Sequence, residues 1–355
     1  MKKKYIFISI SYLISLFTFA QIPDGYYDNA EGLEGTALKI ALHDIIDDHN
    51  SIQYGDIYDI LDQTDQKENG KVWDMYSDVP GGTPPYEYTF FEDECGNYSG
   101  EGSCYNKEHS WPKSWFGGKV YPMYSDLFHI VPTDGYVNGM RSNYPYGEVG
   151  TIIWESENGS KKGYNTFPGY TGIVFEPIDE YKGDFARGYF YMSTRYYNED
   201  GGWPGSDAVD GAELKPWTIS MLLEWHYNDP VSEKERDRCD AIYNIQSNRN
   251  PFIDHPSYVS LIWDPENEIH HIQLSDIIHI FPIQNNKKLR LELINNDTPS
   301  HFHLFLYSVS GQQITEEEMN SDTYNLSIGN IDKGCYILKI SDLSSHINYH
   351  YKFIK

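Results

Sequence analysis

The chain has 355 residues, enough for one sizeable domain and a second, smaller one. Its formal net charge of -26 excludes a protein that holds nucleic acid through bulk positive charge, because such proteins neutralise many phosphates with lysine and arginine. Four cysteines are few for an exported chain of this size, so disulfides are not its main support.

The first twenty residues are typical of a secretory signal. Three lysines at positions 2–4 precede an apolar run over 5–19, and Ala20 offers a small-residue cleavage point. We therefore expect a signal peptide at 1–20 and a mature protein that is secreted or held at the cell surface. No other stretch approaches the roughly 20 apolar residues of a spanning helix, so we expect no membrane span.

The following region mixes helical and strand patterns. Apolar residues recur at helical spacing within 26–49. The aromatic-rich segment 83–111 has strand character interrupted by Gly and Ser turns. An apolar strand-like centre at 127–131 precedes a Pro-Thr-Asp turn that can cap a short helix. Further helices are expected at 184–198, 216–229 and 232–246.

The sequence pattern changes after about Trp263. Short alternating segments such as "KLRLELIN" and "HFHLFLYSVSG" are spaced by Asn, Asp, Ser and Gly turns, which favours a small β-sandwich. We expect an α+β domain over 21–265, a linker over 266–279 and an all-β sandwich domain over 280–355.

The cysteines indicate one local crosslink. Cys95 and Cys104 are separated by "GNYSGEGS", and a disulfide between them would close a small loop just before Glu108. Cys239 and Cys335 have no evident partners, and the lack of a CxxC pair argues against a structural zinc site.

The stretch "CYNKEHSWPKSWFGG" carries the candidate chemistry. Phosphodiester hydrolysis needs a base that activates water and a cation that neutralises developing charge. A histidine serves as the base and oxygen ligands hold a hard cation such as Mg²⁺; Glu108, His109 and Asn138 supply these groups. Adjacent residues of an extended strand point in opposite directions, so Glu108 and His109 need a bend to face one site.

Four ordered motifs place these residues in context. "NKEHSWPKSWF", "SDLFHIVPTDGYVNGMRSNYPYGEV", "YKGDFARGYFYMSTRYY" and "AIYNIQSNRNPFIDHP" together resemble the bacterial endonuclease I family, which belongs to the ββα-metal (His-Me finger) nucleases. The resemblance covers roughly residues 25–265.

The resemblance implies a secreted, metal-dependent, sequence-nonspecific endonuclease that acts on DNA, with RNA as a second candidate substrate. His109 would be the general base, and Glu108 and Asn138 would bind a divalent metal, Mg²⁺ first, with Mn²⁺ or Ca²⁺ as alternatives. The products would carry 5′-phosphate and 3′-hydroxyl ends.

Other positions have less definite roles. Arg141 either contacts a phosphate or ties its helix to the core. The family's phosphate-holding arginine has no clear counterpart, and the candidate replacements are Lys113, Lys119 and Arg187. Asp126 and His129 are expected either to support the site through hydrogen bonds or to be polar residues of the core, and Asn143 is expected to have a structural hydrogen-bonding role. Many relatives carry two histidines after Asp-Leu, whereas this chain has Phe128 before His129. Trp111 and Trp115, which lie in the first of these motifs, either stack on bases or pack in the interior.

Residues 280–355 resemble the C-terminal sorting domains of type IX secretion, on the segments "LFLYSVSGQQI", "GCYILKI" and "YKFIK". The implied partner is the type IX secretion machinery. A generic β-sandwich binding module is the alternative. We expect the protein to be a monomer.

Two other functions stay open at this point. The acidic, aromatic-rich chain would also fit a surface adhesin or binding module with an inactive nuclease-like domain, although such a protein has no need to keep Glu108, His109 and Asn138 together. The second is an enzyme that acts on another phosphodiester.

Overall fold

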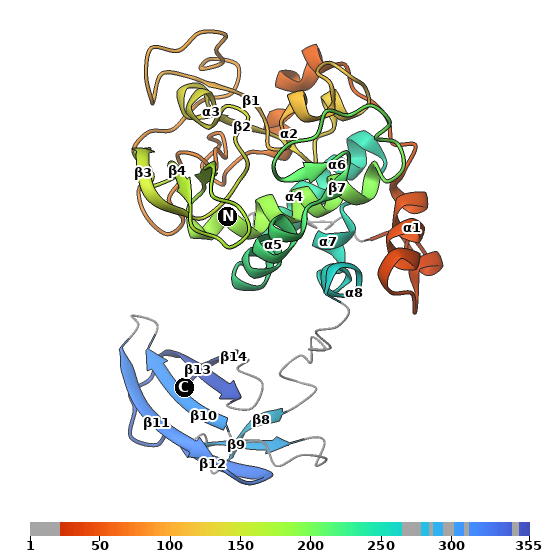
Figure 1. Cartoon of the computed structure of the whole chain (residues 1–355). Helices are drawn as coiled ribbons and strands as arrows, with labels where there is room; N and C mark the ends of the chain where they lie inside the picture. The colour runs from red at the N-terminus through yellow and green to blue at the C-terminus, as the bar shows by residue number, and fades with distance from the viewer. Residues whose placement is uncertain (1–21, 265–277, 284–286, 294–301, 309–311, 343–347) are drawn as a thin grey trace, which may run out of the picture. The chain divides into compact units, whose positions relative to one another are not determined.

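The computed structural model describes residues 22–264, 278–283, 287–293, 302–308, 312–342 and 348–355. The chain divides between residues 266 and 267 into two compact units (Figure 1). The expected signal peptide lies outside the described residues. So does the expected linker, except for its last two positions, which belong to strand β8 (Ile278–Ile283).

The first unit mixes helices and short strands. Its α-helices are α1 (Gly35–Ile46), α2 (Leu61–Thr64), α3 (Gly135–Arg141), α4 (Lys182–Arg195), α5 (Pro216–Asn228), α6 (Glu233–Gln246), α7 (Pro251–Asp254) and α8 (Tyr258–Trp263). Its strands pair antiparallel in small sheets: β1 (Tyr105–His109) with β2 (Ile130–Asp134), β3 (Val149–Glu155) with β4 (Lys161–Asn165) and β5 (Ile173–Glu176), and β6 (Val209–Asp210) with β7 (Glu213–Leu214). The expected α+β class is confirmed.

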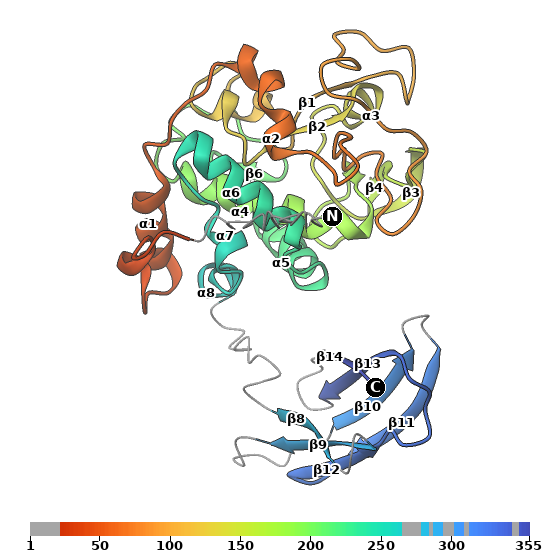
Figure 2. The ribbon, with the colours of Figure 1, turned by 180° about the vertical axis from the view of Figure 1, so that it is seen from behind.

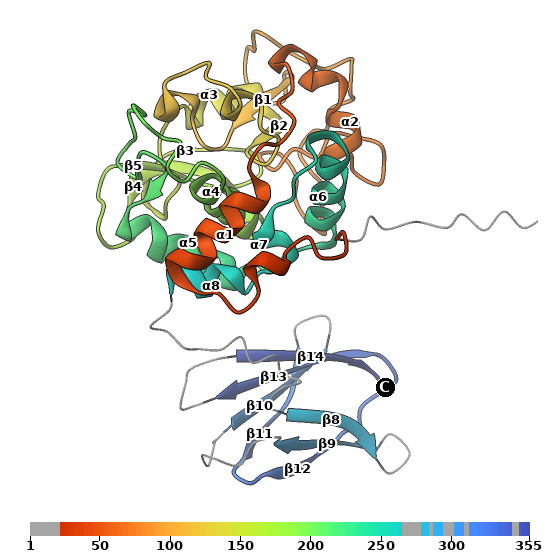
Figure 3. The same ribbon diagram turned by 90° about the vertical axis from the view of Figure 1, so that its right-hand side faces the viewer.

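Helix α4 lies at the centre of this unit. Nearly all of its residues are buried, and it packs against α1, α5 and α7; Figure 3 shows it end-on behind α1 and beside α5. A helix buried on all sides belongs to the core. Because α4 is rich in tyrosine and arginine, the core around it contains hydroxyl and guanidinium groups that need partners.

The predicted helices form where local signals support them. Helix α6 begins with a capping box in which Ser232 and Glu235 bond each other's backbone N–H groups, and α5 begins with Pro216 at its first turn. Helix α1 is shorter than the apolar pattern over 26–49. Gly35 and Asp48, near its two ends, have positive φ angles, and such backbone cannot continue a right-handed helix.

The aromatic segment before β1 differs from the expectation. Over 83–104 the chain forms turns and irregular loop instead of strands, although Tyr88 and Phe90 are buried. The Tyr88 carbonyl accepts a hydrogen bond from the Val72 N–H, so an irregular partner satisfies the backbone there. The β3–β4–β5 sheet, seen at the edge of the unit in Figures 1 and 2, has no counterpart among the elements predicted from the sequence.

The second unit is all β. One sheet has the order β11–β10–β13–β14 and the other the order β12–β9–β8 (Figure 3). The strands after β8 are β9 (Lys288–Leu293), β10 (Phe302–Ser308), β11 (Gln313–Met319), β12 (Thr323–Ser327), β13 (Cys335–Asp342) and β14 (Asn348–Ile354). Buried residues from both sheets, including Leu291 and Leu304, share one hydrophobic core, which is the packing of a β-sandwich. Among the described residues, none of the helices has the length and apolar character to cross a membrane.

Candidate active site

The candidate site is built on a ββα unit made of β1, β2 and α3. Strands β1 and β2 pair antiparallel, with Glu108 opposite Val131 and His109 opposite Ile130. Asp134 ends β2 and caps α3, because its carboxylate accepts the Val137 N–H at 2.7 Å. Strand β2 therefore continues into α3 without an intervening loop, whereas residues 110–129 connect β1 to β2 (Figure 1).

The Glu108 side chain, which projects from β1, is buried. Its Oε1 accepts hydrogen bonds from Arg141 Nη1 at 2.7 Å and from the Tyr76 hydroxyl at 3.2 Å. Burial raises the pKa of Glu108 to about 7 against the opposing effect of Arg141. Since Arg141 and Tyr76 both bond Oε1, we assign Oε2 as the oxygen that can bind a further ligand.

His109 occupies a different environment although it is the next residue. Its ring stacks on Tyr124, with centroids 5.4 Å apart, and on Tyr54, at 5.6 Å. The Nε2 atom lies 3.2 Å from the carbonyl oxygen of Tyr124. A carbonyl only accepts hydrogen bonds, so Nε2 carries the hydrogen and Nδ1 keeps a free lone pair.

The surroundings of His109 keep its imidazole neutral. Burial lowers the pKa of His109 to about 3, and the nearby His129 and Lys113 act in the same direction. A neutral ring held in one tautomer can accept a proton at Nδ1.

Asn138 lies on α3, one turn before Arg141. Its Nδ2 donates to Asn106 Oδ1 at 2.8 Å and, at 3.5 Å, to the carbonyl of Lys107. These bonds hold the amide against Asn106 and Lys107 of β1. They also leave Oδ1 as the side-chain atom that can bind a cation.

The two arginines considered as phosphate ligands both lie in the interior. Arg141 donates to Glu108, to the carbonyls of His109 and Ser110, and to the Tyr189 hydroxyl. Arg187 pairs with Glu235 through two bonds, at 2.5 and 2.9 Å. Both side chains are fully buried, so they support the fold rather than present a cation to substrate.

The lysines remain at the surface. Lys113 begins the 3₁₀ turn Lys113–Phe116 and is exposed, as is Lys119. The charge of Lys113 lowers the pKa of His109, which indicates that Lys113 lies on the side of the site where His109 stands. Asn143 donates to Ser114 Oγ at 3.5 Å, so the end of α3 contacts the turn that carries Lys113.

The expected supporting residues are well connected. Asp126 accepts hydrogen bonds from Tyr191, Tyr196 and Gln246; burial alone would raise the pKa of Asp126, but His49 and other partners hold it below its usual range. His129 Nε2 lies 2.7 Å from the Met123 carbonyl, and its ring is 5.5 Å from that of His109. His129 thus packs directly beside His109, whereas the hydrogen bonds that Asp126 accepts from Tyr191, Tyr196 and Gln246 lead into the core.

The tryptophans of the motif are buried. Trp111 is fully enclosed and Trp115 nearly so; they pack against each other and against Tyr189. They belong to the core and cannot stack on bases in this conformation.

A disulfide joins Cys95 and Cys104, with Cα atoms 5.4 Å apart. The loop it closes covers the start of α3. A Cβ atom built on Gly139 would lie 2.2 Å from the Tyr98 hydroxyl, and one on Gly135 would lie 2.9 Å from Cys95 Sγ. The absence of a side chain at Gly135 and Gly139 therefore lets the disulfide loop approach the helix closely, most strictly at Gly135 beside Cys95.

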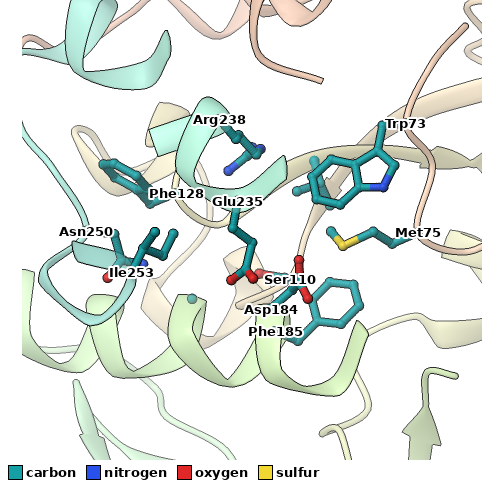
Figure 4. Close-up of a pocket in the computed structure, with 12 residues that line it drawn as sticks. Trp73, Met75, Ser110, Phe128, Asp184, Phe185, Glu235, Arg238, Asn250 and Ile253 are labelled. Atoms are coloured by element: carbon teal, nitrogen blue, oxygen red, sulfur yellow. The ribbon is translucent and has the colours of Figure 1, made fainter. Parts of the chain in front are cut away.

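An internal cavity of about 30 Å³ lies near this site but is not a substrate pocket. Figure 4 shows Glu235 reaching from α6 toward α4, where Asp184 and Phe185 lie, with Ser110 beside them. A space of this size holds about one water molecule. Burial and the neighbouring Glu235 raise the pKa of Asp184 well above its usual range.

The tyrosines that surround the site were not expected from the sequence. Tyr54 and Tyr124 enclose His109, and Tyr76 bonds Glu108. Tyr54 and Tyr76 lie far upstream of β1 in the sequence, and the chain has 31 tyrosines, so no local pattern marked these three.

Comparison with known proteins identifies both parts of the chain. The family model described as Endonuclease I matches residues 34–257, and the model described as Secretion system C-terminal sorting domain matches residues 279–355. The chain is 36% identical to the extracellular ribonuclease of Bacillus subtilis over 252 residues, which cover 68% of this chain and 78% of that protein.

More distant relatives match shorter segments. Identity is 30% over 129 residues to the endonuclease-1 of Buchnera aphidicola, covering 36% of this chain and 44% of that protein. It is 26% over 136 residues to a periplasmic deoxyribonuclease of Aeromonas hydrophila, covering 37% of this chain and 48% of that protein.

The fold, the site and these similarities define a nuclease. The chain belongs to the Endonuclease I family, which confirms the resemblance drawn from its motifs. Its second unit is a type IX secretion sorting domain, so the protein is secreted or carried at the cell surface.

Proposed function

We propose that this nuclease is a metal-dependent, sequence-nonspecific endonuclease that hydrolyses DNA, and RNA as well, to 5′-phosphate and 3′-hydroxyl ends. The observation that carries the proposal is the orientation of His109. Its Nε2 lies against the Tyr124 carbonyl, and its neutral Nδ1 is free. An imidazole held in this way by a backbone acceptor is suited to act as a general base.

The residues available for a cation fit a hard divalent metal. Glu108 Oε2 and Asn138 Oδ1 are oxygen donors on adjoining elements of the ββα unit, and carboxylate and amide oxygens are ligands that Mg²⁺ prefers. We assign these two side chains to bind Mg²⁺, with Mn²⁺ or Ca²⁺ as possible replacements. When bound, the metal would supply positive charge that stabilises the phosphate and the leaving oxygen.

In the proposed reaction, His109 Nδ1 takes one proton from a water molecule. The water oxygen forms a bond to phosphorus while the bond from phosphorus to the 3′-oxygen breaks. The 3′-oxygen then takes up a proton from solvent. The new phosphate stays on the 5′ side, and no protein nucleophile takes part.

Lys113 is our choice for the residue that holds the phosphate. It is exposed, and its charge acts on His109, whereas the guanidiniums of Arg141 and Arg187 are committed to buried partners. A lysine provides a point charge, whereas an arginine can form a bidentate contact. Lys113 should therefore attract the phosphate without fixing its orientation.

One digestion series tests the substrate and cation assignments. Plasmid DNA and a structured RNA are incubated with the purified chain in Mg²⁺, Mn²⁺, Ca²⁺ or excess chelator. We expect both polymers to be cut with Mg²⁺ and neither with chelator, and labelled ends should carry 5′-phosphate. Cleavage of RNA alone, or cutting at a single sequence, would contradict the proposed specificity.

A further inference from the structure

A second cluster of metal-ligating side chains lies apart from the ββα unit. A ring nitrogen of His43, a carboxylate oxygen of Asp47 and one of Glu199 all lie within 4.8 Å of one another. None of these residues belongs to the proposed catalytic site. Helix α1 supplies His43, Asp47 follows its last residue, and Glu199 follows α4.

The backbone places the first two ligands on the same side of α1. The N–H of Asp47 bonds the carbonyl of His43 at 2.9 Å, which continues the helical pattern for one more residue. Residues four positions apart are neighbours on a helix surface. Asp47 and His43 are therefore positioned by the helix itself.

The third ligand is brought in by a turn. Asn198 has a φ of 60°, and the N–H of Glu199 bonds the carbonyl of Tyr196 at 3.0 Å. This left-handed residue reverses the chain after α4, so the Glu199 carboxylate returns toward α1. Its Oε1 lies 3.8 Å from His43 Nε2.

The orientation of His43 is that of a metal ligand. Its Nδ1 lies 3.0 and 3.2 Å from the carbonyl oxygens of Arg195 and Thr194. Because these oxygens only accept, Nδ1 carries the hydrogen, and the lone pair of a neutral ring lies on Nε2, which is 3.8 Å from Glu199 Oε1. Metal-binding histidines commonly donate their other N–H to a backbone carbonyl in this way.

We propose that His43, Asp47 and Glu199 form a second divalent-metal site, of the zinc class, that ties the end of α1 to the end of α4. One imidazole nitrogen with two carboxylate oxygens suits Zn²⁺ better than Mg²⁺ or Ca²⁺, which favour oxygen alone. Water would complete the coordination, because Glu199 is exposed and His43 and Asp47 are only partly buried.

Two features limit the affinity of this site. Arg195 Nη1 donates to Glu199 Oε1 at 2.7 Å, so the metal shares that carboxylate with a cation. Ligand atoms around a tetrahedral zinc lie about 3.3 Å apart, so the side chains must rotate slightly inward. The site should therefore bind more weakly than a closed structural zinc site.

The test uses the full secreted chain, stripped of metal and dialysed against Zn²⁺ in excess Mg²⁺. We compare wild type with His43→Gln, with Glu199→Gln, and with His279→Gln as a control at an exposed histidine elsewhere. The wild type and the control should bind one more zinc per chain than the two site variants, and their unfolding temperature should rise with Zn²⁺. The site variants should bind this zinc at least tenfold more weakly and keep Mg²⁺-dependent activity.

Equal zinc content in wild type and Glu199→Gln would overturn the proposal, as would an undiminished rise in unfolding temperature for either site variant. Glu199 is exposed, so its substitution keeps the test valid if His43→Gln folds poorly. The test is independent of the proposed nuclease mechanism, because it measures the zinc bound per chain and the unfolding temperature instead of cleavage.

Discussion

Arg141 Nη1 lies 2.7 Å from Glu108 Oε1, and both side chains are buried. This ion pair joins the last turn of α3 to the strand β1 that carries His109. Arg141 also donates hydrogen bonds to the carbonyls of His109 and Ser110. A single side chain therefore holds the backbone of the segment that carries the candidate general base, His109.

Arg141→Met should destabilise the protein strongly. Removing one member of a buried pair leaves the other charge without compensation, at a cost of about 3–5 kcal/mol. Urea unfolding of Arg141→Met beside Lys119→Ala measures the effect, and the surface variant should stay within about 0.5 kcal/mol of wild type. Equal stability of Arg141→Met and wild type would show that the pair does not hold the unit together.

Lys113→Ala should slow cleavage without affecting the fold. A hydrogen bond to a charged group contributes about 1.5–3 kcal/mol, so we expect a loss of roughly tenfold or more in kcat/KM on DNA. Lys119→Ala is the matched control and should lose little. If the two variants lost the same amount, the phosphate contact would have to be reassigned.

The Asp184 carboxyl should make stability depend on pH. Its folded pKa is raised by burial and by Glu235, and it donates a hydrogen bond to Asp229. The folded state therefore keeps a proton that the unfolded state releases above about pH 4. Stability from this group is present at low pH and falls as pH rises, by at most about 1.4 kcal/mol per pH unit.

Asp184→Asn keeps a donor toward Asp229 and removes the titration. Relative to wild type, the variant should gain stability steadily between pH 5 and pH 8, as followed by chemical unfolding at several pH values. A difference that is constant across this range would mean that Asp184 does not retain its proton in the folded state.

Loss of the disulfide should weaken the loop over α3. Closing a loop of about ten residues contributes roughly 2–3 kcal/mol in the chain-entropy description. We expect the double variant Cys95→Ala, Cys104→Ala to unfold at a lower temperature by several degrees. Treatment of wild type with a reductant should reproduce the shift, and reductant should leave the double variant unchanged.

Local sequence signals predicted the helices better than the strands. Ser232 and Glu235 form the capping box that starts α6, and Pro216 starts α5, so both helices were correctly expected. The segment 83–104 is rich in aromatic residues, yet its Pro and Gly residues and its distant backbone partners hold it as a loop. Burial of Tyr88 and Phe90 explains the apolar pattern without a strand.

In the site too, sequence patterns predicted some residues and missed those that only tertiary packing brings in. Adjacent motifs pointed to Glu108, His109 and Asn138, and the structure places all three on one ββα unit. The partners of these residues come from distant segments, as with Tyr54 and Tyr76, and only tertiary packing brings them together. For Arg141 the sequence left two roles open, and its full burial favours the structural one.

Cleavage of plasmid DNA by His109→Ala and His109→Gln in Mg²⁺, with unfolding curves for both variants, tests whether His109 is the general base. A general base contributes about 10²–10⁴-fold, so we predict a loss of that size in folded protein, together with loss of wild-type activity in chelator. A folded His109 variant that cuts at the wild-type rate would contradict this prediction.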